Sequence, residues 1–464
     1  MQLSPRRHEL LSVYMLGFGT LFMYLGYHTQ SFICESVIHS VHLKSPERIS
    51  GYAGYYGQAI HYTAFAVSSL FTASLQHYLA SKWILVLSTM FFAVYHLGFF
   101  YINSYYYYGS QIMMGIAYSL YNNGEGAYLA EHSSRRTVES NTGIETAVGH
   151  SSMLVGGAAL LVIFNIFPVA ESEVTSHFRS FSEQHIQAIY GTFFGLTLVS
   201  TVIFSLLPTK QYDSIASNSP RILPSFKNQF KALARTSIHP NVILLTFTFM
   251  HMGLLVSLFL GIYPTTLSFS ASVAKDPYIV ALYSVFAGLA EFSGGSHTDR
   301  SNDSAAFSLL TLIVTIALHA ISTEVALVLF QLSVPQNATF EPTIDNAIWF
   351  QPSRTLACIF GYLMGLSDFT LTMARAVICQ KAVPENRMEV FSLTRIHMCI
   401  ASCIVLYLSP YMTVTAWTTV LSTSLLIGCS CFVIVVRRTN TADDIVSPVE
   451  QLDPKNKISV TNVA

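Results

Sequence analysis

Long apolar runs recur from one end of the chain to the other. An α-helix rises about 1.5 Å per residue, so a run of about 20 residues crosses a hydrocarbon core roughly 30 Å thick. Twelve runs approach or exceed this length, at residues 10–33, 51–75, 83–102, 106–130, 144–167, 188–207, 241–267, 278–295, 305–334, 353–380, 388–411 and 415–436. Because lipid offers the backbone no hydrogen bonds, such segments must be helices. The sequence therefore predicts an all-α, multi-pass membrane protein with twelve transmembrane helices.

The composition agrees with lipid as the main solvent of this chain. Hydrophobic residues make up 52% of the sequence and charged residues 11%, whereas a soluble domain carries about 25% charged residues. The net charge of −1 excludes a nucleic-acid binder that relies on a basic surface. We therefore expect the lipid bilayer as a partner of this protein and no nucleic acid.

The basic residues between the predicted helices indicate how the chain is oriented. With the N-terminus in the cytoplasm, seventeen of the 24 Lys and Arg residues fall on the cytoplasmic side. Five fall on the opposite side, at Lys44, Arg48, Arg179, Lys275 and Arg354. The remaining two, Arg375 and Arg395, lie inside spans. Because Lys and Arg concentrate in cytoplasmic loops, we expect both termini in the cytoplasm. The sequence does not distinguish the plasma membrane from an internal membrane.

Two glycosylation sequons provide a separate test of this orientation. One begins at Asn337, in a predicted outer loop, and the other begins at Asn302, in a predicted inner loop. Glycan transfer to such sequons occurs on secreted and lumenal surfaces. We therefore predict a glycan on Asn337 and none on Asn302.

The longest predicted cytoplasmic connection, residues 208–240, divides the twelve spans into two groups of six. Paired halves of this kind are typical of transporters built from repeats. We expect an N-terminal half over residues 1–207, the linker over 208–240, a C-terminal half over 241–438 and a disordered cytoplasmic tail over 439–464. Within the linker, Phe226, Phe230 and Leu233 stand among basic residues. This stretch is either a short interfacial amphipathic helix or a solvated linker.

The loop after the eighth span carries a motif. Residues 295–300 read GSHTDR and resemble the G-x-x-x-D-R core of the loop signature of the major facilitator superfamily. In that superfamily the glycine, here Gly295, permits close helix approach, and the Asp and Arg, here Asp299 and Arg300, form a charged cytoplasmic latch. The equivalent loop after the second span, residues 73–79, lacks all three residues. The resemblance implies the major facilitator fold, with one of its two latch copies lost.

Two further acids belong with this latch by analogy. Glu291 lies one helical turn before Gly295, near the inner end of span eight. In major facilitators the latch loop packs near the start of span five, where Glu145 lies. The analogy therefore implies that Glu145 pairs with Arg300 and that Glu291 joins Asp299 and Arg300.

Ionisable residues inside the spans are candidate functional residues, because each costs about 2.5–3.5 kcal/mol at the bilayer centre. Asp368 lies near the middle of span ten, and Arg375 follows it by two helical turns on the same face. This spacing is suited to two groups that line one wet path. Asp368 either carries a proton or contacts a substrate, or it only hydrogen-bonds neighbouring helices.

Glu125 lies toward the inner end of span four, between Gly124 and Gly126. Glycines let neighbouring helices approach closely, so this carboxyl is expected to be enclosed by protein. Two interpretations remain open for Glu125. It either couples proton movement to transport or takes part in a tight helix contact.

Other reactive residue types give no sign of catalysis or metal binding. Five histidines lie inside spans, at positions 28, 61, 150, 251 and 319, and most of them are expected to be hydrogen-bonded packing residues and not proton carriers. They lack the spacing of a metal site. The seven cysteines read as small apolar residues, and neither a phosphate loop nor a nucleophile motif is present. We expect no metal, no cofactor and no enzyme activity.

Five short segments together point to one family. They read GY at residues 51–52, GEGAYL at 124–129, NTGI at 141–144, GLAEFSGG at 288–295 and GLSD at 365–368. This set resembles the Unc-93-like branch of the major facilitator superfamily, and within it the subgroup of major facilitator superfamily domain-containing protein eleven. Where that family carries Trp and Gln around the span-four glycines, this chain has Tyr121 and Glu125.

The resemblance implies the facilitator fold and two possible functions. Characterised members of the branch act as regulatory subunits of potassium channels or as trafficking partners of receptors, whereas others are orphan solute carriers. The first interpretation is a non-catalytic partner of another membrane protein, such as an ion channel or receptor, and the lost latch copy favours it. The alternative is a proton-coupled transporter of a small solute, which the intramembrane acids favour.

Overall fold

The computed structural model describes residues 4–452, except for 76–77, 135, 167–180, 213, 215–225 and 299–308. The first half of the chain forms α1 (Pro5–Lys44), α2 (Ala53–Ser69), α3 (Thr72–Leu75), α4 (Ser81–Leu97), η1 (Gly98–Phe100), α5 (Ser104–Glu131), α6 (Val138–His150), α7 (Ser152–Ile166) and α8 (Glu183–Ser205). The second half forms α9 (Phe226–Ser237), α10 (Pro240–Ser257), the π-helical turn η4 (Leu258–Ile262), α11 (Tyr263–Phe269), α12 (Ile279–Thr298), α13 (Leu309–Ser333), α14 (Arg354–Lys381), η6 (Pro384–Asn386), α15 (Arg387–Leu408), η7 (Ser409–Tyr411) and α16 (Val414–Leu452).

The structure confirms an all-helical, multi-pass membrane fold, and within the described residues all twelve predicted spans fall on helices. Each predicted span falls on a long helical segment: α1, α2, α4, α5, α6 with α7, and α8 in the first half, then α10 through α11, α12, α13, α14, α15 and α16. Within the described residues, nine of these segments are long and apolar enough to cross a membrane on their own. The other three are α2 and α12, whose apolar stretches are shorter, and α5, which carries polar side chains such as Gln111 and Asn122 along its length.

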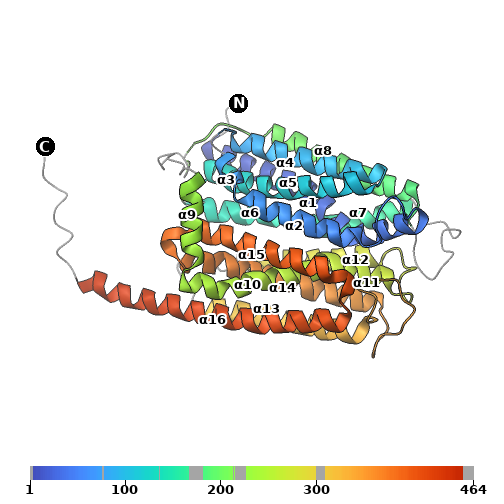
Figure 1. Ribbon diagram of the computed structural model, residues 1–464. Helices are drawn as coiled ribbons and strands as arrows, with labels where there is room; N and C mark the ends of the chain where they lie inside the picture. The colour runs from blue at the N-terminus through green and yellow to red at the C-terminus, as the bar shows by residue number, and fades with distance from the viewer. Residues whose placement is uncertain are drawn as a thin grey trace.

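The two groups of six helices lie side by side in one bundle. Figure 1 shows α1 to α8 on one side of the bundle and α10 to α16 on the other, with the long helices running nearly parallel. The chain is almost entirely helical within the described residues, where the β structure is a single bridge between Ser270 and Thr343. This arrangement agrees with the two bundled groups of helices that the sequence predicts.

The two halves touch closely along α7 and α12. A Cβ on Gly157 of α7 would lie 2.7 Å from the carbonyl oxygen of Ala281, and a Cβ on Gly288 of α12 would overlap the backbone of Leu154. Ser284 on α12 also donates a hydrogen bond of 2.8 Å to the carbonyl oxygen of Met153. Glycine permits this approach because small residues let helix backbones come together.

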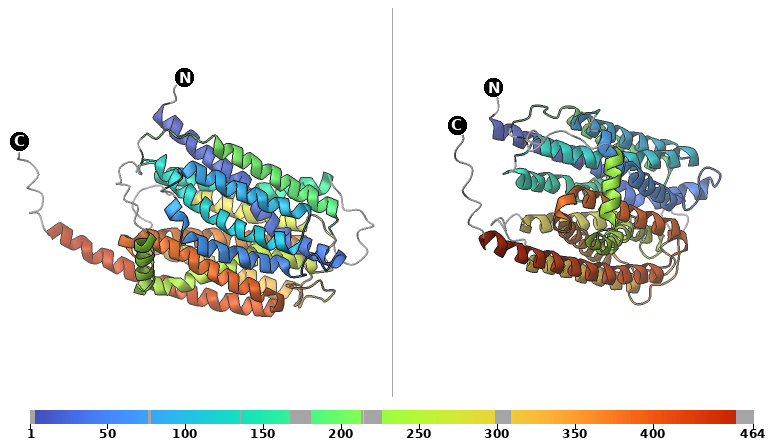
Figure 2. Two further views of the ribbon diagram at one scale, coloured as in Figure 1. Left: turned by 45° about the horizontal axis from the view of Figure 1, so that its top comes forward. Right: turned by 60° about the vertical axis from the view of Figure 1, so that its left-hand side comes forward.

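The bundle has two ends that differ in how the chain crosses them. At one end, called the α9 end, α9 lies across the ends of the long helices, nearly perpendicular to them (Figures 1 and 2). The other end, called the loop end, carries the connections after Lys44 and before Arg354. There, Tyr55 of the first half donates a 2.5 Å hydrogen bond to the carbonyl oxygen of Thr339. Tyr278 of the second half donates one of 3.1 Å to Asn165.

The last helix is longer than the last predicted span. We expected a tail from residue 439 onward, but α16 continues to Leu452. Residues 453–464 lie outside the described part of the chain. The apolar run ends near residue 436 because apolar side chains are required only where the helix lies within the membrane.

Candidate functional site

Seven ionisable side chains from both halves meet in the middle of the bundle and form what we call the central charged cluster. They come from five helical segments: Glu125 on α5, Glu145 and His150 on α6, Glu291 on α12, Asp368 and Arg375 on α14, and Arg395 on α15. Charges of both signs are therefore interleaved at one place. An arrangement of this kind inside a membrane protein is a candidate functional site.

The first half contributes two carboxyls that face each other. Glu145 is 2% exposed and accepts a 3.0 Å hydrogen bond from the hydroxyl of Thr20. The hydroxyl of Tyr121 lies 2.7 Å from the same Thr20 oxygen. The carboxyl of Glu145 is also within hydrogen-bonding reach of the Glu125 carboxyl. The first half thus brings two acidic side chains together inside the bundle.

One contact in the cluster crosses from the first half to the second. Nδ1 of His150 lies 3.5 Å from a carboxylate oxygen of Glu291. Glu291 is buried, and within the described part of the chain its oxygens have no hydrogen bond of good geometry. His150 keeps 44% of its side-chain surface accessible. This ion pair requires a protonated imidazole, so the state of His150 controls a contact between the halves.

The second half contributes Asp368 and the two arginines. Asp368 interacts electrostatically with Glu291, His150 and Arg375. The interaction with Arg375 agrees with the two-turn spacing, which places both side chains on one face of α14. Both residues are half-buried, and Nε of Arg375 has no hydrogen-bond partner among the described residues.

A small enclosed cavity lies beside the cluster, between α1, α2 and α5. Its walls include Tyr27, His61, Tyr62 and Gln111, and Tyr62 interacts electrostatically with Asp368. The volume of about 10 Å³ matches the space that one water molecule needs. In this conformation the cavity is therefore large enough for water and too small for a solute.

The structure places three of the five residues that the sequence assigned to a latch. Glu145 and Glu291 both lie in the central charged cluster, against Glu125 and His150 respectively. Gly295 lies near the end of α12. Asp299 and Arg300, like Asn302, are outside the described residues, so the predicted pair of Glu145 and Arg300 stays a prediction.

One buried acid was missed by the sequence analysis. Glu35 on α1 is 2% exposed, and neither carboxylate oxygen has a hydrogen bond of good geometry within the described residues, although the backbone amide of Tyr55 faces it. A Cβ on Gly54 would overlap the Glu35 side chain, so the glycine makes room for the carboxyl. The predicted first span ended at residue 33, whereas α1 continues to Lys44. Apolar residues on both sides of Glu35, from Phe32 to Val41, were the available signal.

Four of the other intramembrane histidines make hydrogen-bonding or ring contacts within their own half. His28 lies 3.1 Å from the Ser152 hydroxyl, and His61 lies 3.2 Å from the Tyr27 hydroxyl. The Nε2 atoms of His251 and His319 are 3.2 Å apart. His150 differs from these four because its partner is an acid of the other half.

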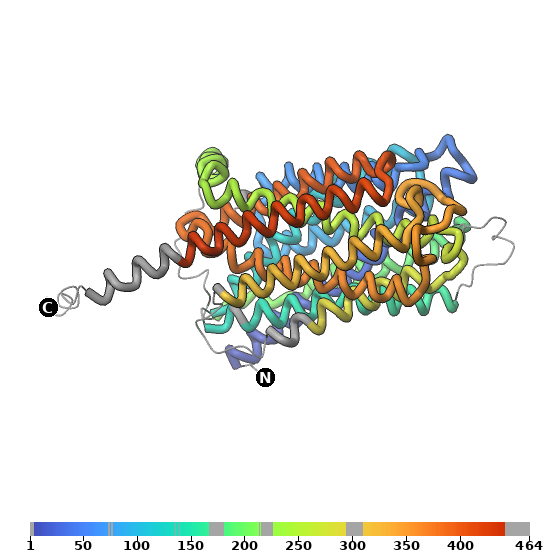
Figure 3. The backbone as a smooth tube through the Cα atoms, turned by 90° about the horizontal axis from the view of Figure 1, so that it is seen from below, coloured from blue at the N-terminus to red at the C-terminus, as the bar shows by residue number. Residues whose placement is uncertain are grey.

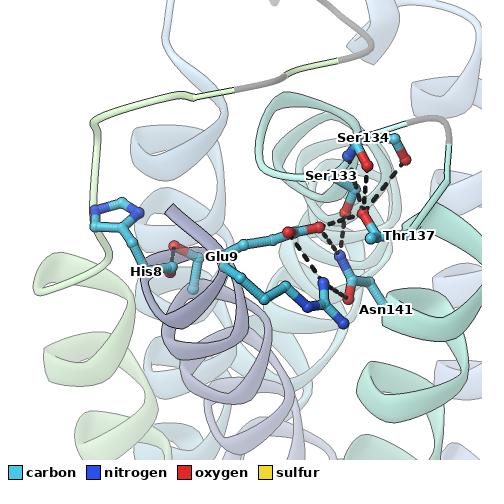
Figure 4. A network of polar contacts seen from close by, with 8 residues as sticks. His8, Glu9, Ser133, Ser134, Thr137 and Asn141 are labelled. Atoms are coloured by element: carbon cyan, nitrogen blue, oxygen red, sulfur yellow. Dashed lines mark hydrogen bonds and ion pairs between the residues drawn. The ribbon is translucent and has the colours of Figure 1, made fainter. Parts of the chain in front are cut away.

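A second polar network ties the start of α1 to the start of α6 at the α9 end (Figure 4). Glu9 accepts hydrogen bonds from Thr137 and from Asn141, the latter of 2.6 Å, and pairs with Arg6 at 3.0 Å. Asn141 also donates a 2.9 Å hydrogen bond to Ser133. Asn141 begins the NTGI segment on which the family resemblance partly rests, and its role here is to hold two helix ends together.

The comparisons with known proteins identify the family of the chain. The family described as ion channel regulatory protein UNC-93 matches residues 45–433 of the chain. The chain belongs to the UNC-93 family. The resemblance inferred from the five short segments is confirmed, and the helices of the described residues make this chain a multi-pass membrane protein.

Two relatives of this UNC-93 family chain match it over most of its length. It is 23% identical over 427 residues to the UNC93-like protein MFSD11 of Xenopus laevis, covering 88% of the chain and 92% of the relative. The MFSD11 protein of Xenopus tropicalis is also 23% identical, over 428 residues, with the same coverage.

Two solved transporters show the same fold as the UNC-93 family chain. The nucleoside transporter NupG superposes with a TM-score of 0.58 at 13% identity, covering 93% of this chain and 98% of that one. The peptide transporter POT in complex with alafosfalin gives a TM-score of 0.65 at 9% identity, covering 94% and 99%. At these identities the likeness shows the major facilitator fold alone.

Proposed function

We propose that this protein is a secondary transporter in which proton binding at the central charged cluster drives movement of the two halves. The observation that carries this proposal is the contact of His150 with Glu291. It joins the halves through a group that gains and loses a proton near neutral pH in water. Glu125 with Glu145 and Asp368 with Arg375 surround it and supply further proton-binding groups.

We rank the two functions in the opposite order to the sequence analysis. The sequence favoured a non-catalytic partner because one latch copy is lost. A protein that serves only as a scaffold gains nothing from placing seven ionisable groups at the meeting point of its halves, and each of them is costly inside a membrane. The cluster therefore supports transport more strongly than the lost copy argues against it.

The cluster also indicates the class of solute. Four carboxyls and two guanidinium groups stand close together, so a solute that carries both charges finds partners of both signs. Amino acids and short peptides have this property. Nucleosides, which NupG carries according to its name, provide an uncharged comparison.

Proton uptake by reconstituted protein tests this proposal. Vesicles that contain the protein and an entrapped pH-sensitive dye are given a panel of dipeptides, amino acids and nucleosides. We expect proton movement with at least one zwitterionic solute, and we expect Asp368→Asn to abolish it. If correctly folded protein moves no protons with any solute of the panel, the result would contradict transport.

The second candidate is regulation of another membrane protein, which the description of the matched family favours. In this case the partner is an ion channel or a receptor, and the facilitator body is a binding surface. Co-expression with a potassium channel tests it through the channel current. A regulator changes the current equally well with Asp368→Asn, whereas a transporter leaves the current unchanged.

We also propose that both termini lie in the cytoplasm, which places α9 on that side. The bias of Lys and Arg supports this orientation. Asn337 then lies in an outer loop, where Thr339 of the same sequon donates a 2.6 Å hydrogen bond to the carbonyl oxygen of Met412. The loop that carries the sequon is thus fastened to the loop end of the bundle.

A further inference from the structure

The short helix α9 differs from every long helix in its direction. Figures 1 and 2 show that it crosses the end of the bundle nearly at right angles to the transmembrane helices. Figure 3, viewed at a right angle to Figure 1, shows α9 end-on at the rim of the bundle. Because the long helices run along the membrane normal, α9 lies along the plane of the membrane.

Contacts with both halves hold α9 in this position, and Phe226 makes one of them while keeping 41% of its surface exposed. Thr236 is buried and its hydroxyl accepts a 2.9 Å hydrogen bond from Asn386, at the start of α15. The ring of Phe226 stacks on Phe71 of the first half, with 5.0 Å between ring centroids. Leu233 packs against the core from the same helix. The helix is therefore fixed to both halves and presents its remaining faces outward.

The outward faces carry two stripes of different chemistry. Lys227, Lys231 and Arg235 recur every four residues, so they share one face, and all three are exposed. Phe226 and Phe230 form the neighbouring stripe and are 41% and 53% exposed. The sequence of α9, FKNQFKALARTS, contains no acid that neutralises the basic stripe.

This pattern continues beyond α9 along the same end of the bundle. Ile238 follows directly and is 70% exposed, and Met388 at the start of α15 is 76% exposed. Large apolar side chains of this kind are stable when they enter the acyl boundary of a bilayer. The basic side chains next to them then reach the level of the lipid headgroups.

We propose that α9 is a binding site for anionic phospholipids of the cytoplasmic leaflet, in which the basic stripe binds headgroup phosphates while the Phe226 and Phe230 stripe enters the acyl boundary. The charge of the stripe is complementary to that leaflet, which is rich in anionic lipid. Because α9 contacts both halves, lipid bound there reaches the junction between them. This site rests on the proposed cytoplasmic orientation of α9 and is independent of the proposed transport function.

A polarity-sensitive fluorophore on Ala234→Cys tests the proposal in the full-length protein. Ala234 is exposed on α9. The protein is placed in nanodiscs of phosphatidylcholine, with or without one third phosphatidylserine. The parent chain, treated with the same fluorophore, is the control for labelling of the native cysteines. We expect emission to rise about twofold and shift to the blue when phosphatidylserine is present, and high salt to reduce the effect.

Charge reversal identifies the residues responsible. The triple change Lys227→Glu, Lys231→Glu and Arg235→Glu is expected to remove the response to phosphatidylserine, and the milder Lys227→Gln, Lys231→Gln and Arg235→Gln to reduce it. The control reverses three exposed arginines outside α9, namely Arg387→Glu, Arg437→Glu and Arg438→Glu. This control is expected to keep the response.

Several outcomes overturn the proposal. Equal emission in both kinds of nanodisc, or an equal loss with the control variant, shows that α9 does not bind anionic lipid specifically. A response in pure phosphatidylcholine on addition of inositol hexakisphosphate assigns the stripe to a soluble phosphate compound instead. A response there to poly-glutamate, with none to phosphatidylserine, assigns it to an acidic protein segment.

Discussion

At the residue scale, the contact of His150 with Glu291 is the part of the central charged cluster where a single substitution is expected to cost the most stability. Glu291 is 5% exposed, and the imidazole 3.5 Å away is its counter-charge. Removing one member of a buried ion pair costs about 3–5 kcal/mol, because the other charge remains buried alone. The partial exposure of His150 reduces this cost, since water screens the charge that remains.

We predict that His150→Gln lowers the thermal unfolding temperature in detergent and that adding Glu291→Gln restores much of the loss. The expected cost of the single change is about 1–3 kcal/mol, below the fully buried value. A double-mutant cycle by scanning fluorimetry measures the coupling. Strictly additive effects of the two changes would show that the residues do not interact.

The second prediction at this scale concerns Glu35 and the glycine that faces it. Gly54→Ala is expected to destabilise the protein, because the new Cβ overlaps the Glu35 side chain. Glu35→Gln is expected to leave stability unchanged or to raise it, since an amide avoids the cost of a buried carboxylate. Gly143→Ala on α6 is the matched control, because a Cβ there meets nothing within 4 Å. A loss with Gly143→Ala as large as that with Gly54→Ala contradicts this explanation.

At the element scale, the network around Glu9 explains how the start of α6 is held. The helix opens without a side-chain cap on Thr137, so its position depends on contacts with α1. Glu9, Arg6 and Asn141 provide these contacts (Figure 4). The same helix carries Glu145 and His150 two and three turns further on, so the network also sets the position of the cluster.

We predict that Asn141→Leu destabilises the protein by about 1–3 kcal/mol, because the partly buried Glu9 carboxylate loses one of its three partners and the buried Ser133 hydroxyl loses its donor. The exposed neighbour Thr142→Ala serves as the control, since its hydroxyl bonds only to the Val138 carbonyl oxygen of its own helix. Unfolding in denaturant, followed by helical circular dichroism, measures both. Equal stability of the two variants would refute a clamping role for Asn141.

At the scale of the whole molecule, the sequence predicted the number and order of the helices because lipid imposes a minimum apolar length on each. The sequence predicted helix ends and buried polar residues less well, because an apolar run does not mark them. Glu35 was missed because the apolar run stops before the helix does, and α5 passes as a span although its own composition is polar. The lengths of the apolar runs also do not predict which face of each helix packs against its neighbours. Glu145 and Glu291 were assigned to the latch by analogy alone, and nothing in the sequence indicated that Glu145 lies against Glu125 and Glu291 against His150.

The orientation of the whole chain predicts which sequon is used. Asn337 is expected to carry a glycan when the protein is made in eukaryotic cells, so Asn337→Gln removes the mobility shift that glycosidase treatment abolishes in the parent. Asn302→Gln is expected to have no effect. A shift that depends on Asn302 would invert the proposed topology.

The central claim is that the two halves move relative to each other about the central charged cluster, and pulsed electron spin resonance tests it without knowledge of the solute. One pair of spin labels spans the loop end, at Tyr105 and Ile344, and a second spans the α9 end, at Arg136 and Glu385, all of them exposed. Between mildly alkaline and acidic pH, the two distances are predicted to change in opposite directions, and Asp368→Asn to suppress the change. Distances at both ends that stay the same at every pH, with or without solute, would contradict the account.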